Sequence, residues 1–269
     1  MSSTVDWLTY GVTCASLVIF IACFHASHHL SIKYIPVFRT FSLNDQANWC
    51  SRVGSTVHAT VICMGILYSL TQQSWDAQLR PLHSTHLAMG LFSWSIAYFA
   101  YDLFLVVYYK IPMWHVFVAH HLVAMIPFCI YNFYRGHCMA DTYLLSLYLL
   151  VELCVVPMNI VSFLEQLGHA ADSPRVFLYA SISFVSWVLV RGLLPIYLLY
   201  ALWTTFIPSI DLSSHEAWVC TAPAIICGHL ISLFCVGCLV FIITPEFRAR
   251  LKARSTRDRS TYGTFVDEM

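Results

Sequence analysis

Residues 86–109, HLAMGLFSWSIAYFAYDLFLVVYY, decide the class of fold. Asp102 is the only Asp, Glu, Lys or Arg in this stretch, and about 20 consecutive apolar residues are enough to cross a bilayer. The stretch is too long for a strand. In lipid, a helix also satisfies every backbone polar group within its own segment. These residues therefore predict a transmembrane helix.

Six further stretches have the same character, and together they predict an all-α polytopic membrane protein. The seven predicted spans are about 7–27, 53–70, 86–109, 114–134, 141–163, 177–206 and 217–243. Of the 269 residues, 59% are hydrophobic and only 10% are charged, and the mean hydropathy is +0.69. A soluble domain carries about a quarter charged residues, so the composition excludes a single water-soluble globule.

The basic residues favour one orientation of these spans. Eleven lie on the side of the C-terminus and two, Arg80 and Arg135, lie on the other; the eleven are Lys33, Arg39, Arg52, Lys110, Arg175 and the six from Arg248 to Arg259. Because cytosolic loops are enriched in Lys and Arg, we expect a luminal or external N-terminus. Residues 248–269 are expected to form a basic cytosolic tail, either merely solvated or bound to anionic lipid. With a net charge of zero, nucleic acid is not expected as a partner.

The eleven cysteines are scattered through apolar stretches and are odd in number. Buried cysteine behaves as a small hydrophobic residue, so the sequence does not predict a disulfide framework. Four prolines lie well inside predicted spans, where each is expected to kink its helix: Pro127, Pro157, Pro195 and Pro223.

Ionisable residues inside the predicted spans are the candidates for a functional site. Asp102, Glu152 and Arg191 would each cost roughly 2.5–3.5 kcal/mol if they faced lipid, so they are expected to face the protein interior. The 1.5 Å rise per residue places His58, Asp102, His120 and His121 in one layer, roughly 7–11 Å below the cytosolic face. Glu152, Arg191 and His229 form a deeper layer, about 16–21 Å down, where Glu152 and Arg191 are expected to pair.

Two kinds of chemistry fit the shallower layer. An aspartate beside a histidine can orient the imidazole, which then takes a proton from an amine or hydroxyl, as acyl transfer onto a lipid would require. The same groups could bind a lipid headgroup without any reaction. A di-iron site is disfavoured because the predicted topology separates His83 and His86 from the His25–His29 group, so no metal ligands are assigned.

Several residues in this layer also carry a resemblance to a known family. The pattern Trp49-x-Ser51-Arg52-x-x-Ser55-x-x-His58 resembles the start of the TLC domain family (the TRAM, ceramide synthase and neuronal ceroid protein group). Similar features follow in order along the chain: Tyr101-Asp102, His120-His121, and Glu152 with Pro157 and Asn159. The resemblance covers roughly residues 46–247. It leaves residues 1–45, with the first helix, and residues 248–269 outside the domain.

The resemblance implies a six-helix membrane barrel preceded by one extra helix, residence in the endoplasmic reticulum or a related endomembrane, and a role in sphingolipid or phospholipid handling. The ceramide synthases carry an acid cluster after the paired histidines, whereas this chain has Leu144, Leu145 and Tyr148 there. The chain is therefore more similar to the small TLC-domain-containing proteins.

The sequence thus predicts a protein of lipid homeostasis that binds, carries or modifies a long-chain lipid in an intramembrane cavity. The alternative is an acyl-CoA-dependent N-acyltransferase, with acyl-CoA as co-substrate and no other cofactor. The candidate catalytic residues are His120, His121 and Asp102. The candidate substrate-binding residues are His58, Arg52, Glu152, Arg191, Asn159 and Tyr98.

Overall fold

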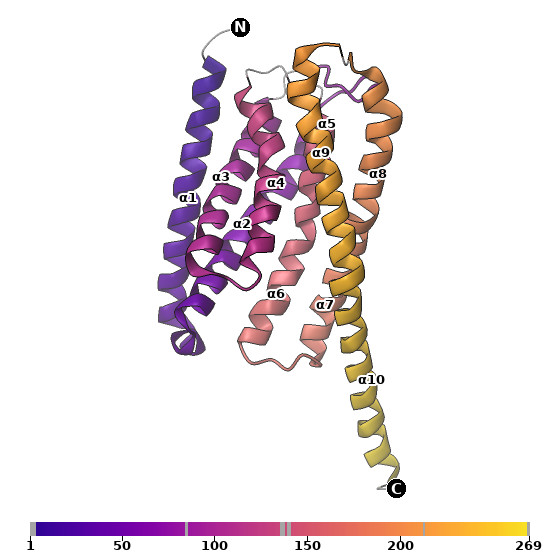
Figure 1. Ribbon diagram of the computed structural model, residues 1–269. Coiled ribbons are helices and arrows are strands. Elements are labelled where there is room, and N and C mark those ends of the chain that lie inside the picture. The colour runs from indigo at the N-terminus through magenta and orange to yellow at the C-terminus, as the bar shows by residue number, and fades with distance from the viewer. Residues whose placement is uncertain (1–3, 84–85, 135–137, 139–140, 212, 268–269) are drawn as a thin grey trace.

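The computed structural model describes residues 4–83, 86–134, 138, 141–211 and 213–267. Within them, seven helical spans are long and apolar enough to cross a membrane, which confirms the predicted number. No β-strand occurs in these residues; only an isolated bridge joins Trp75 to Pro81. Figure 1 shows the spans running side by side, with the N-terminus at one end of the bundle and the C-terminus beyond the other.

The first four spans are single helices, and the last three combine several helical segments. The single helices are α1 (Thr4–Tyr34), α2 (Leu43–Gln72), α3 (His86–Tyr109) and α4 (Trp114–Phe133), with a short 3₁₀ helix η1 (Pro36–Thr40) after α1. The fifth span comprises α5 (Thr142–Leu149), the 3₁₀ helix η3 (Leu150–Cys154) and α6 (Val155–Gln166). The sixth comprises α7 (Pro174–Trp187), η4 (Val188–Leu193), α8 (Leu194–Ala201), η5 (Leu202–Phe206) and η6 (Ile207–Ser209). The seventh comprises α9 (His215–Cys238), η7 (Leu239–Ile243) and α10 (Thr244–Asp267).

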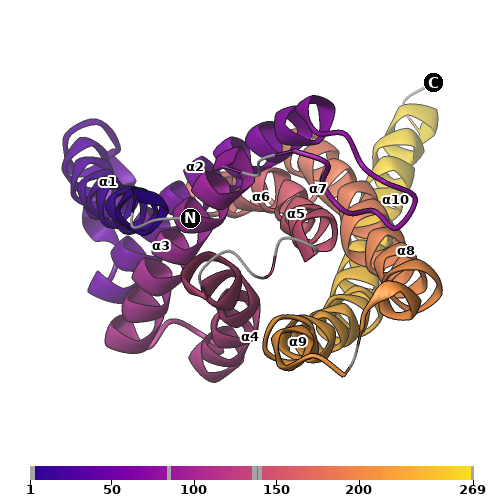
Figure 2. The ribbon, with the colours of Figure 1, turned by 90° about the horizontal axis from the view of Figure 1, so that it is seen from above.

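Six of the spans form a ring, and α1 lies outside it. Around the ring, α2 contacts α3, α3 contacts α4, and α4 contacts α9. The seventh span then contacts η4 and α8, α7 contacts α6, and α6 returns to α2. Figure 2, viewed along the bundle, shows α1 against the outer side of α2 and α3. This is the six-helix barrel with one extra helix that the sequence led us to expect.

The second span begins earlier than predicted. The sequence placed Arg52 in a loop before residue 53, whereas α2 already begins at Leu43. The hydroxyl of Ser42 caps the helix by accepting a hydrogen bond from the backbone N–H of Asp45. Trp49 is buried in this first part of α2 and packs against Phe38. Arg52 consequently lies inside the helix, about 13 Å from its start.

The last span also extends further than predicted, because α9, η7 and α10 form one continuous helical run to Asp267. Phe247 stacks on Phe184 of α7 at 4.3 Å between ring centroids. Arg250 pairs with Glu165 of α6 and with Glu246 of its own helix. These contacts hold the start of α10 against the bundle.

Two of the four prolines inside the spans coincide with a change of helix type. Pro195 follows the π-helical turn η4, and Pro157 follows the 3₁₀ segment η3. A proline has no N–H and its ring collides with the carbonyl four residues earlier, so a change of helical pitch relieves the crowding. By contrast, α4 continues through Pro127 and α9 continues through Pro223.

The structure contains one disulfide that the sequence did not indicate. Cys138, between α4 and α5, forms a disulfide with Cys220 of α9, and their Cα atoms lie 5.2 Å apart. The two residues are 82 positions apart in the chain, so no local spacing indicates the pair. The other nine cysteines are free thiols, including Cys235 and Cys238 of the C-x-x-C pattern.

Candidate functional site

A cavity of about 710 Å³ lies inside the ring, in the half that contains the α6–α7 connection and the start of α10. Every span of the ring contributes to its wall. Ligand sites commonly have volumes of about 300–1,000 Å³ and combine apolar walls with a few convergent polar groups. The polar and ionisable lining residues are Asn48, Ser51, Arg52, Ser55, Tyr98, Asp102, His120, His121, Glu152, Asn159, Ser162, Glu165, Ser183, Arg191, Glu246 and Arg250.

Asp102 and His121 form the central polar pair on one wall. Oδ2 of Asp102 lies 3.0 Å from Nε2 of His121, and its Oδ1 accepts a 2.6 Å hydrogen bond from the hydroxyl of Ser51. Nδ1 of His121 lies 2.6 Å from the carbonyl oxygen of Phe117, one turn earlier on α4. The structure thus places Asp102 where it fixes the orientation of the His121 ring.

This arrangement limits what His121 can do. Both ring nitrogens face acceptor oxygens, so the pair holds a proton that is either on the imidazole, as in an ion pair, or shared with the carboxylate. Neither nitrogen is free to accept a proton from a bound ligand. As placed, His121 and Asp102 form a fixed polar surface on the cavity wall.

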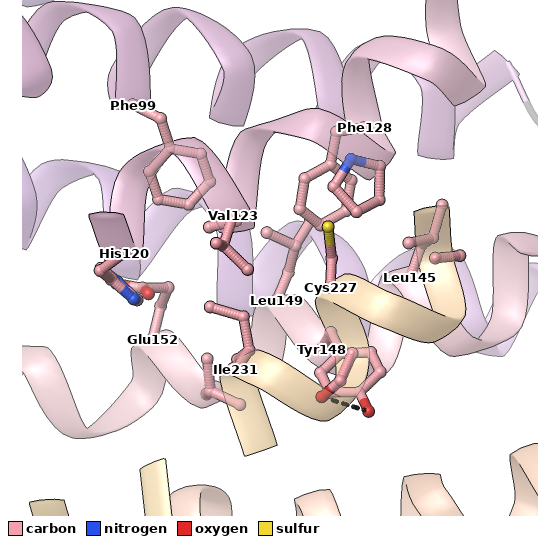
Figure 3. Close-up of a pocket in the computed structure, with 15 residues that line it drawn as sticks. Phe99, His120, Val123, Phe128, Leu145, Tyr148, Leu149, Glu152, Cys227 and Ile231 are labelled. Atoms are coloured by element: carbon pink, nitrogen blue, oxygen red, sulfur yellow. Dashed lines mark hydrogen bonds between the residues drawn. The ribbon is translucent and has the colours of Figure 1, made fainter. Parts of the chain in front are cut away.

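His120 is placed differently from its neighbour. It stacks on Phe234 of α9 at 5.1 Å between centroids, and its buried Nδ1 has no hydrogen-bond partner among the described residues. It lines the large cavity and also a smaller pocket of about 40 Å³ that continues into the bundle. Figure 3 shows His120 and Glu152 together at one end of this smaller pocket and Leu145 toward the other. Among the paired histidines, only His120 has a ring nitrogen available for proton transfer.

Glu152 and Arg191 form the deeper pair that the sequence predicted. Nη2 of Arg191 lies 3.5 Å from Oε1 of Glu152, and its Nε donates to the carbonyl oxygen of Val151 at 3.0 Å. The guanidinium also lies over the ring of Trp187, 4.6 Å from its centroid. Both charged side chains are almost fully buried, so each depends on the other for charge compensation.

Arg52 and Asn159 connect α2 to α6. They lie nearer the end of the cavity that is lined by Glu165, Glu246 and Arg250, which we call its mouth. Nη1 of Arg52 donates to Oδ1 of Asn159 at 3.1 Å. The side-chain amide of Asn159 in turn donates to the backbone carbonyl of Arg52 and to the hydroxyls of Ser55 and Thr56. Asn159 therefore holds the guanidinium of Arg52 in one position on the cavity wall.

Two of the predicted histidines lie away from this cavity. His58 is completely buried between α2 and α3, where it stacks on Tyr98 at 4.0 Å and its Nε2 lies 3.2 Å from the hydroxyl of Ser95. It is not among the cavity-lining residues, whereas Tyr98 is. His229 accepts a hydrogen bond from Nε1 of Trp203, so it joins α9 to η5 rather than meeting Glu152 and Arg191.

The charged mouth contains residues that the sequence analysis did not select. Nη1 of Arg250 lies 2.8 Å from Oε1 of Glu165, and its Nη2 lies 2.7 Å from Oε1 of Glu246. The i, i+4 spacing of Glu246 and Arg250 could have indicated a continuing helix. The contact with Glu165 depends on α10 returning to α6 and has no local signal.

Within the described residues, no group of three or more His, Cys, Asp or Glu side chains is arranged to hold a metal ion. Of the histidines in the first span that resemble an iron-binding motif, His28 lies within 3.1 Å of the side-chain oxygen of Gln46.

Comparison with known proteins agrees with this architecture. No curated protein and no solved structure matches the chain significantly. The family model described as the TLC domain (TRAM, LAG1 and CLN8) matches residues 48–244, which is more than half of the chain. The matched region begins in α2 and ends at the start of α10, so it covers the six-span ring and leaves α1 outside. The chain therefore belongs to the TLC domain family of integral membrane proteins, a family linked to lipid metabolism and homeostasis.

Proposed function

We propose that this protein binds a long-chain membrane lipid in the large cavity and acts in lipid homeostasis by holding, transferring or modifying that lipid. The observation that carries the proposal is a cavity of about 710 Å³ inside the ring of spans, lined by both convergent polar groups and apolar side chains. Ser51, Asp102 and His121 form a hydrogen-bonded polar group, while side chains such as Val155 and Phe234 supply apolar surface.

The physical argument starts from the surroundings of the cavity. Within a bilayer, the molecules available to fill an apolar space are lipids, whose chains match apolar side chains and whose headgroups need hydrogen-bonding partners. The hydrogen-bonded group of Ser51, Asp102 and His121 joins α2, α3 and α4, whereas Val155, Phe184 and Phe234 supply apolar surface from the other three spans. A ligand with one polar end and one apolar end fits this division.

The same proposal includes an orientation. Lys33, Arg39, Lys110 and Arg175 lie in or beside the connections α1–α2, α3–α4 and α6–α7. Figure 1 shows these connections at the end of the bundle from which α10 projects, and basic residues favour the cytosolic side. The Cys138–Cys220 disulfide lies at the opposite end, and disulfides persist in oxidising compartments such as the lumen of the endoplasmic reticulum. We therefore propose a luminal N-terminus, with the mouth of the cavity facing the cytosol. Residence in the endoplasmic reticulum or a related endomembrane is proposed from the family resemblance.

An acyltransferase is the second candidate, and one observation favours it. His120 has a buried ring nitrogen without a partner beside the cavity, as a general base would need. In such a reaction the amine nitrogen of the acceptor lipid would attack the thioester carbonyl of acyl-CoA. His120 would accept the proton released by the amine nitrogen. The carbon–sulfur bond would break and the same proton would pass from His120 to the departing sulfur, so that CoA leaves as the thiol.

The binding proposal is tested by filling the cavity. Ser183 lines the cavity from α7, whereas its neighbour Ile182 is 46% exposed on the outer surface. We expect Ser183→Trp to reduce strongly the amount of lipid that copurifies with the protein, measured by mass spectrometry, and the matched control Ile182→Trp to retain it. Equal lipid content in the two variants, both with wild-type thermal stability, would refute the proposal.

The acyltransferase candidate has a separate test, in which purified protein is supplied with acyl-CoA and a sphingoid base. Formation of ceramide by wild type, and its loss in His120→Ala, would establish catalysis. The absence of product from lipid-loaded wild-type protein would leave lipid binding as the function.

A further inference from the structure

We propose that the lipid in this cavity carries an oxyanion headgroup, phosphate or carboxylate, and that Arg52 is the residue that binds it. This inference rests on the proposed lipid-binding function and specifies its ligand. The observation behind it is that Arg52, on the wall of an open cavity, forms no ion pair with any carboxylate of the described residues.

The charges around the cavity can be paired one by one. Asp102 faces His121, and Glu152 faces Arg191. Glu165 and Glu246 both contact Arg250. Each of these four carboxylates is therefore engaged with an arginine or a histidine. Among the described residues, no carboxylate forms an ion pair with Arg52. A guanidinium keeps its charge under all ordinary conditions. Arg52 is half-buried and its Nε is fully shielded from solvent, so an anion supplied by a ligand would stabilise the charge.

The geometry of the guanidinium supports the same conclusion. Within the part of the chain that the structure describes, only its Nη1 has a hydrogen-bond partner, the side-chain oxygen of Asn159. Nε is buried without a partner, and Nη2 is not engaged by another described residue. Nε and Nη2 are the two donors of the side-on fork that binds two oxygens of one phosphate or carboxylate group. Asn159 thus acts as a positioning residue that occupies the third nitrogen and leaves this fork available.

The position of Arg52 suits a headgroup rather than a hydrocarbon chain. It lies about 13 Å along α2 from the end at the cavity mouth. Val155 and Phe184 also line the cavity and supply apolar surface for the remainder of the ligand. A cationic amine headgroup would be repelled at this point, so the inference also argues against a sphingoid base as the group that contacts Arg52.

The test compares two ligands that share their octanoyl chains and differ in charge, and adds a fatty acid as a second kind of anion. Purified full-length protein in a neutral detergent is titrated with dioctanoyl phosphatidylglycerol, with dioctanoylglycerol and with decanoate, and binding is followed by native mass spectrometry. We expect Arg52→Gln to weaken phosphatidylglycerol binding about tenfold to a hundredfold, as for the loss of a charge-assisted hydrogen bond. Binding of the uncharged dioctanoylglycerol should remain unchanged. Tighter binding of phosphatidylglycerol than of decanoate identifies the phosphodiester as the oxyanion, and the reverse order identifies a fatty acid.

Three variants make the result interpretable. Arg175→Gln removes an exposed guanidinium outside the cavity and should bind all ligands as wild type does. Asn159→Asp places a carboxylate against Arg52, so it should weaken anionic-lipid binding with Arg52 still present; this variant serves if Arg52→Gln does not fold. Equal affinity of wild type for phosphatidylglycerol and dioctanoylglycerol, with both lost in Ser183→Trp, would overturn the oxyanion inference and leave the cavity proposal intact. If Ser183→Trp changes no ligand's binding, the proposed function itself fails.

Discussion

Glu152→Gln is expected to destabilise the protein more than Arg191→Met, although both substitutions break the same ion pair. The two side chains are only 8% and 7% exposed, and the closest nitrogen and oxygen are 3.5 Å apart. At this distance, with an effective dielectric constant of about 20, their attraction is about 5 kcal/mol. Loss of one partner from a buried pair typically costs about 3–5 kcal/mol, which is the expected cost of Glu152→Gln.

The asymmetry follows from what remains after each substitution. Without Glu152, the guanidinium of Arg191 stays charged in a buried position, because it cannot release its proton. Without Arg191, Glu152 can take up a proton and become neutral, so the cost should fall to about 1–3 kcal/mol, that of the lost hydrogen bonds. The double variant Glu152→Met/Arg191→Met buries no charge and is expected to be about as stable as wild type.

The measurement is a double-mutant cycle of apparent free energies of unfolding, obtained by titrating SDS into neutral-detergent micelles. Glu246→Gln is the matched control: its oxygen lies nearer to Arg250, at 2.7 Å, but its side chain is 54% exposed, so a cost below about 1 kcal/mol is expected. The reasoning is refuted if Glu152→Gln costs no more than this control, or if Arg191→Met is the more damaging single change.

Three further substitutions test other parts of the structure. Cys138→Ser should remove the disulfide with Cys220, lower the free energy of unfolding by about 2–4 kcal/mol, and abolish the mobility difference between reduced and non-reduced protein on gels; a wild-type chain without that difference would contradict the pairing. Burial raises the pKa of Asp141 to about 7, so the folded state keeps a proton that the unfolded chain has released above about pH 4. The free energy of unfolding should therefore fall by up to about 1.4 kcal/mol per pH unit from pH 4 to 7. Melting curves of Asp141→Asn should lack this slope, and an unchanged slope would contradict a buried, protonated Asp141. A Cβ at residue 228 would lie 3.0 Å from the hydroxyl of Tyr148, so Gly228→Ala should displace that ring at a cost of about 1–3 kcal/mol, and an unaltered melting temperature would show that the ring adapts freely.

The sequence predicted correctly those parts of the candidate site that depend only on how deep a residue lies along its helix. The 1.5 Å rise per residue placed Asp102 and His121 at a similar level, and the structure brings them within 3.0 Å. The same calculation put His58 at that level, yet His58 faces the contact between α2 and α3. Depth does not specify which way a side chain points around its helix, because that direction depends on the neighbours the helix acquires in the ring.

The neighbouring histidines show the same difference between local and tertiary information. Adjacent residues differ by about 100° around a helix, so His120 and His121 had to point in different directions. Which of them would meet Asp102, and which would keep a free nitrogen, depended on where α3 and α9 lie relative to α4.

The sequence by itself determined the number of membrane spans, the all-helical class and the inward placement of the charged residues. Each of these follows from the cost of exposing polar groups to lipid, which acts on every segment separately. Only the tertiary structure decided the Cys138–Cys220 pair, the contact of Arg250 with Glu165 and the lack of an anionic partner for Arg52. The first two features join residues far apart in the chain, and the third, which holds for the described residues, depends on where every carboxylate around the cavity lies. They exist because the ring closes and brings the first and last of its spans around one cavity.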